Sequence, residues 1–110
     1  MKGTEKQIKW AEDIMHDVLD TCEKNIKINS ERHEQTGLDM FKAQAVLYKI
    51  VKATFEKAFA GIEDAGAFID MRHRYSGETA NRFVARMMEQ INKGRITIEQ
   101  IAKDNGVTEY

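Results

Sequence analysis

The sequence predicts an all-α protein, a compact bundle of two long and two to three short helices in one domain spanning residues 1–110. Apolar residues recur at three- and four-residue spacing over several long stretches, which is the pattern of amphipathic helices. The chain contains no proline, the residue that most strongly interrupts helices. Only Arg95–Ile98 could be extended, and it is too short to be more than a local link. The length is sufficient for a single core without disulfides or metal.

The first helix is expected over Thr4–Cys22, because Thr4 and Gln7 have the spacing of a capping box. A continuation through Ile26 and Ile28 stays open, although Asn25 and Asn29 weaken the helix there. One face is apolar and consists of Ile8, Ala11, Ile14, Met15, Val18, Leu19 and Cys22. The other face is acidic and includes Glu12, Asp13, Asp17 and Asp20. Cys22 is the only cysteine, and its place on the apolar face predicts a buried thiol, which fits a reducing, cytoplasmic setting.

The stretch Asn29–Gly37 has no apolar residue and ends in glycine, so we expect a solvent-exposed connection and the best candidate for a mobile loop. A solvated extension of the first helix into this stretch stays open. A second helix is expected over Leu38–Ala60, with Thr36 as its cap and Gly61 as a left-handed residue that ends it. Its apolar residues cover more than one face of the helix, which predicts a central helix that contacts neighbours on two sides.

Three shorter helices complete the prediction. The first runs over about Glu63–Arg74 with Asp64 as its cap, and it is broken at Ser76 and Gly77. The next covers about Glu78–Asn92 and is terminated by Gly94. The last begins at a second capping box and ends at glycine; its residues are Thr97, Gln100 and Gly106.

The segment Ile96–Thr108 has the look of the first helix and turn of a helix-turn-helix unit. The sequence ends at Tyr110, where a recognition helix would begin, and without that helix no major groove is read. We therefore expect the apolar side chains of this segment to be core contacts. They are Ile98, Ile101, Ala102 and Val107.

Charge is unevenly distributed although the formal net charge is only −1. Residues 1–40 carry six cations against nine acids, a net −3, whereas residues 71–95 carry six cations against two acids, a net +4. The candidate binding residues lie in the second region, where Arg82 and Arg86 are one helical turn apart. They are Arg72, Arg74, Tyr75, Arg82 and Arg86. Arginine suits bidentate recognition of phosphate or carboxylate.

Three interpretations of this arginine-rich region stay open: docking against acidic parts of the same protein or of a second subunit, binding of nucleic acid, and binding of an acidic protein. Tyr75 could stack on a base or pack beside the arginines. Catalytic signatures are missing from the sequence, including a phosphate-binding glycine loop and a nucleophile elbow. His16 lies one turn from several carboxylates, but no second helix offers a matching set, so we expect no metal and no cofactor.

No apolar run approaches the ~20 residues of a membrane span, and charges interrupt any secretory signal. The opening Gly3–Ile14 resembles an N-terminal signature in a loose group of small uncharacterised proteins of bacteria, phages and mobile elements. A later segment of that group is similar to Ala67–Arg72 here. The resemblance covers about twelve residues at the front and six in the middle, and it implies no catalytic residues. Trp10 lies off the apolar face; we favour packing over exposure for a partner.

We therefore expect a small, non-enzymatic, cytoplasmic accessory protein of a phage or mobile element that acts by binding a protein or a nucleic acid. One alternative is a nucleic-acid-binding protein that uses the arginine-rich face. Another is a protein inhibitor or adaptor, for example against a host defence enzyme, that presents the acidic face of the first helix. Self-association also stays open, because Met87 and Met88 adapt readily to a partner helix.

Overall fold

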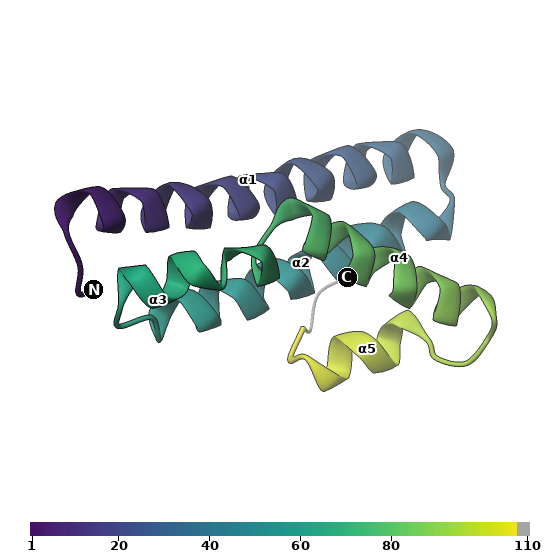
Figure 1. The fold of residues 1–110 in the computed structure, drawn as a ribbon. Coiled ribbons are helices and arrows are strands. Elements are labelled where there is room, and N and C mark those ends of the chain that lie inside the picture. The colour runs from purple at the N-terminus through teal and green to yellow at the C-terminus, as the bar shows by residue number, and fades with distance from the viewer. Residues whose placement is uncertain (108–110) are drawn as a thin grey trace.

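Two long antiparallel helices, α1 and α2, form the frame of the molecule, and three shorter helices pack along them (Figure 1). The computed structural model describes residues 1–107, and within that range it is all-α and has no strand. The all-α prediction is therefore confirmed. In chain order the elements are α1 (Glu5–Thr36), α2 (Asp39–Ala60), α3 (Ala65–Asp70), the 3-10 turn η1 (Arg72–Arg74), α4 (Gly77–Asn92) and α5 (Ile98–Asp104).

Helix α1 continues to Thr36, so the expected loop over Asn29–Gly37 was wrong up to that residue, and the alternative of a solvated extension of the first helix is confirmed because most side chains from 31 to 36 are exposed. Asn29 is buried, and its side-chain amide donates to the Asn25 carbonyl at 2.8 Å, so a polar residue is accommodated on the packed face. The helix ends only at Gly37, which has a φ of 70° and donates its N–H to the His33 carbonyl. This left-handed conformation favours glycine, so the glycine of the predicted connection supplies the helix end.

The caps of α2 also differ from the prediction. Thr36 belongs to α1, where its hydroxyl donates to the Arg32 carbonyl, and Leu38 takes the N-cap position with no side-chain hydrogen bond. Gly61 ends α2 with a φ of −91°, so it is not the left-handed residue that was expected. The chain leaves this helix through ordinary right-handed geometry and needs no glycine conformation there.

Two of the three short α-helices, α3 and α5, begin at their predicted caps, whereas no cap was predicted for α4. Asp64 accepts a hydrogen bond from the Ala67 N–H, but the helix expected over Glu63–Arg74 is divided into α3 and η1. Ser76 caps α4 by accepting from the Thr79 N–H. The two predicted capping boxes, at the starts of α1 and α5, are both formed. Such caps satisfy backbone donors that the helix itself leaves unpaired.

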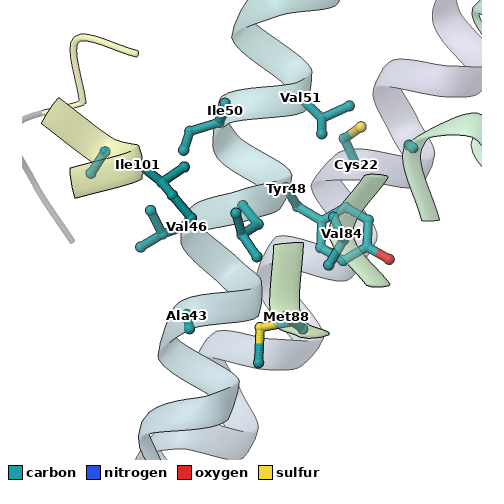
Figure 2. Close-up of a cluster of buried hydrophobic side chains, with 12 residues drawn as sticks. Cys22, Ala43, Val46, Tyr48, Ile50, Val51, Val84, Met88 and Ile101 are labelled. Carbon is teal, nitrogen blue, oxygen red and sulfur yellow. The ribbon is translucent and has the colours of Figure 1, made fainter. Parts of the chain in front are cut away.

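The core has two clusters, and α2 is central because it contacts α1, α4 and α5. In Figure 2, Ile101 of α5 points toward Val46 and Ile50 of α2, and Val84 of α4 lies beside Tyr48. Cys22 is fully buried, as predicted, and this burial raises the pKa of its thiol. The expected core residues of the last segment are confirmed: Ile101 and Ala102 are buried, and Ile98 and Val107 pack against them. Thr108, the last residue of that segment, lies outside the described residues.

Candidate binding surface

The arginine-rich region is held in place by the junction between η1 and α4. The Thr79 hydroxyl donates to the His73 carbonyl at 2.8 Å, and Ser76 accepts the Thr79 N–H at 3.1 Å. These bonds tie the end of η1 to the first turn of α4. The positions of Arg72 and Arg74 relative to α4 are therefore set by backbone and cap contacts rather than by a free loop.

Arg72 leans over the N-terminal half of α1 and makes the best-defined contact among the candidate residues. Its guanidinium carbon lies 5.3 Å from the centre of the Trp10 ring, and its Nη1 donates to the Ile69 carbonyl at 2.8 Å. Trp10 is nevertheless 49% exposed. A cation over an indole face is attracted by the ring quadrupole, so the two side chains hold each other while both remain open to solvent.

The Trp10–Arg72 contact forms because the start of α1 is hydrogen-bonded to the connection between α2 and α3. The Lys2 N–H donates to the Glu63 carbonyl, and the Ala65 N–H donates to the Lys2 carbonyl, each at 2.7 Å. A side chain on Gly3 would come within 3.1 Å of the Ala65 Cβ, so glycine permits this close approach. Residues 3–14 and residues 67–72 consequently lie against each other.

Tyr75 lies in the aromatic part of the core. Its ring centre is 5.4 Å from those of Phe59 and Phe68 and 5.6 Å from that of Phe55. Edge-to-face and tilted contacts of this kind stabilise aromatic clusters. Tyr75 is thus a packing residue. Of the two roles considered from the sequence, stacking on a base or packing, the structure shows packing, and the contacts are with these phenylalanine rings.

Arg82 and Arg86 share the outer side of α4, but the charge there is largely balanced. Arg82 forms an ion pair with Glu78, and Lys93 pairs with Glu89 at 2.7 Å, both over four residues of the same helix. The side chain of Arg86 has no ion pair or hydrogen bond within residues 1–107. The net charge of +4 for residues 71–95 already subtracts these two glutamates, and of the cations there that lack an ion pair within residues 1–107 only Arg86 lies on α4.

A hollow of about 470 Å³ lies beside Arg72, between α1 and the η1–α4 junction. Its walls include apolar atoms of Ile14 and Val18, the carboxylate of Asp17 and the side chain of His73. Such a mixed site can hold a partner's side chain by packing and hydrogen bonds. Within the described residues no three His, Cys, Asp or Glu side chains are grouped so that they could hold a metal ion.

The sequence alone located the arginines but missed their most specific contact. Trp10 lies outside the apolar face of α1, and that position was the available signal that its ring has another partner. The partner itself could not be found from the pattern, because Arg72 belongs to a different element. Among residues 1–107, no helix is both long enough and apolar enough to cross a membrane. Comparison of the chain with protein-family models, curated proteins and solved structures gave no match.

Proposed function

We propose that this chain is a small, non-enzymatic accessory protein of a phage or mobile element that acts by binding a macromolecule through the surface around Trp10 and Arg72. The observation that supports this proposal is the half-exposed Trp10 ring held under Arg72, an arginine that also lines a hollow. Tryptophan and arginine dominate the binding energy of protein interfaces, because they combine a large contact area with a directed polar group.

A protein is the partner that we favour. Arg82 is already paired with Glu78, and the whole chain has a net charge of −1, which opposes binding driven by release of phosphate counterions. The resemblance of residues 3–14 and 67–72 to proteins of phages and mobile elements supports the proposed origin. Both segments contribute a residue to the Trp10–Arg72 contact.

Nucleic acid is the second candidate, since Arg74 and Arg86 are exposed and the Trp10 ring could stack on a base. This alternative predicts an affinity that falls steeply with salt. Fluorescence anisotropy with labelled single- and double-stranded DNA and RNA at low and moderate salt separates the two candidates. Binding that disappears when Arg82 and Arg86 are both changed to Gln would favour nucleic acid.

The test of the favoured candidate uses the fluorescence of Trp10, which is the only tryptophan of the chain. A partner is first captured from nuclease-treated host lysate and identified, and then it is titrated with the purified chain. We expect Arg72→Ala to weaken affinity by ~10-fold or more, about 1.4 kcal/mol. Trp10→Ala should have at least this effect, measured by calorimetry because the fluorophore is lost.

Trp10→Phe is the matched control, since it keeps an aromatic ring and should retain most of the affinity. Arg82→Gln should change the affinity by less than ~3-fold, because this side chain already has an ion-pair partner. Unchanged affinity of both Trp10→Ala and Arg72→Ala would contradict the proposal.

A further inference from the structure

A second surface lies in the groove between α1 and α2. A hollow of about 740 Å³ has lining residues only from these two helices, and a smaller one of about 200 Å³ continues it toward their connection. Lys49 lines both hollows, so they adjoin at this residue along the groove between α1 and α2. Residues 23–34 of α1 and 42–56 of α2 border it, which corresponds to a length of roughly 16–21 Å at the rise of an α-helix.

Lysines from both helices converge on this groove, which we call the lysine groove. Lys24 and Lys27 lie three residues apart on α1, and Lys49 and Lys52 lie three residues apart on α2. Like charges at such spacing repel each other on a helix surface. The fold therefore keeps an arrangement of charge that is locally unfavourable in the free protein and that an anionic partner would relieve.

Only one of these four lysines is neutralised. Lys52 Nζ lies 2.6 Å from Glu23 Oε1 and 3.8 Å from Glu56 Oε1. The hydrogen bond to Glu23 raises the pKa of Lys52, so this ammonium stays charged and held across the two helices. Lys24, Lys27 and Lys49 make no ion pair or side-chain hydrogen bond within residues 1–107. Three positive charges are thus available at the rims.

The floor of the groove is apolar. Ile26 and Ala53 line it between the lysine side chains, whose own methylene stems add apolar surface. The lining residues include no Phe, Tyr or Trp, and the imidazole of His33 is their only aromatic ring, so a nucleic-acid strand would find no row of stacking platforms. An amphipathic helix in a groove between two helices buries an apolar row against the floor while its flanking side chains meet the rims.

We propose that the lysine groove binds an acidic amphipathic helix of a partner protein. The apolar row of that helix lies on Ile26 and Ala53, and its carboxylates reach Lys24 and Lys27 on one side and Lys49 on the other. A groove of this length accommodates a helix of about 14 residues. This surface is distinct from the one around Trp10, because none of its lining residues belongs to that surface.

The experiment uses a fluorescein-labelled helical peptide of about 14 residues, with leucines spaced three and four apart and flanked by glutamates. Anisotropy is measured against the wild-type chain and the triple variant K24Q/K27Q/K49Q. The matched control is K6Q/K57Q/K103Q, which removes the same charge from exposed lysines that do not line the groove. Circular dichroism verifies that both variants retain the wild-type helix content.

We expect the groove variant to bind the peptide at least tenfold more weakly than the wild type, and the control variant to bind within threefold of it. A peptide with glutamine in place of glutamate should not bind. An equal loss in both variants, or no binding at low salt, would overturn the proposal. So would a labelled DNA duplex that competes with the peptide and depends on the same three lysines, since the groove would then be a nucleic-acid site.

These outcomes do not depend on the function proposed for Trp10 and Arg72. Arg72→Ala should leave peptide binding within threefold of the wild type, and the peptide should not alter the fluorescence of Trp10. If the groove fails its test, a partner that perturbs Trp10 fluorescence would still support the first surface.

Discussion

The outer side of α4 and the lysine groove present opposite arrangements of positive charge. On α4 and its C-cap the cations are close together in the sequence, and two of them, Arg82 and the C-cap Lys93, are paired with glutamates of α4. In the groove the cations come from two helices, and Lys24, Lys27 and Lys49 lack such partners within the described residues. The comparison teaches that a charge count along a sequence does not locate the cations that two distant helices bring together. The packing of α1 against α2 decides where those cations meet.

The largest expected effect concerns Tyr75, which was grouped with the arginines from the sequence but packs in the aromatic core. Tyr75→Ala should reduce the free energy of unfolding by about 2–3 kcal/mol, less than a fully buried aromatic because the ring is only partly buried. The exposed neighbour provides the control, since Arg74→Ala should change the free energy by less than ~0.5 kcal/mol. Urea denaturation measures both. If Tyr75→Ala and Arg74→Ala change the free energy of unfolding by the same amount, the placement of Tyr75 in the aromatic core would be contradicted.

The second prediction is a difference in sign between the two charged regions. Lys49→Gln should raise the free energy of unfolding by ~0.2–0.5 kcal/mol at low salt, because it removes repulsion from Lys52, and α2 has no acid three or four residues from Lys49. Arg82→Gln should lower it by ~0.3–0.5 kcal/mol, because it removes the pair with Glu78. Both differences should shrink at 0.5 M salt as the charges are screened. Effects of the same sign in the two regions would contradict the comparison.

The third prediction concerns alkaline pH. Burial raises the pKa of Cys22 above its ordinary value of 9.0, and the Glu23 hydrogen bond raises the pKa of Lys52 above 10.5. The folded protein therefore keeps these protons to higher pH than the unfolded chain does. Their contribution is complete below about pH 9 and is lost as the pH rises through the folded-state pKa values.

Denaturant midpoints at pH 7 and pH 10 test this expectation. Cys22→Ala removes the thiol part of the dependence, so its midpoint should fall less between the two pH values than that of the wild type. A midpoint that is unchanged or higher at pH 10 in the wild type would show that neither proton is held more tightly in the folded state.

Much of the fold was predictable because its signals are local. Thr4 with Gln7 and Thr97 with Gln100 formed capping boxes where the sequence placed them, since each needs only neighbouring residues. The end of α1 was not predictable in the same way. Asn29 is a weak helix former, and its burial within the core of the folded protein, together with its bond to the Asn25 carbonyl, allows the helix to continue.

The contacts of the binding surfaces also fall into two kinds: those between neighbours in the sequence, which can be predicted, and those between distant elements, which cannot. The positions of Arg82 and Glu78 are sufficient to predict their pairing, because residues four apart on a helix are neighbours. The Trp10–Arg72 contact and the convergence of Lys27 with Lys49 depend on how distant elements pack, including the register between α1 and α2. The periodicity of apolar residues along the sequence does not determine how α1 and α2 are aligned with each other.

The most direct test of this account compares two variants of equal charge in one titration with the labelled acidic peptide. K24Q/K27Q/K49Q removes the unpaired charges of the lysine groove, and R74Q/R82Q/R86Q removes the same number from η1 and α4. We predict at least a tenfold loss of affinity for the lysine variant and less than a threefold loss for the arginine variant. Loss in the arginine variant with full binding in the lysine variant would show that the anionic partner binds at η1 and α4 and not in the lysine groove.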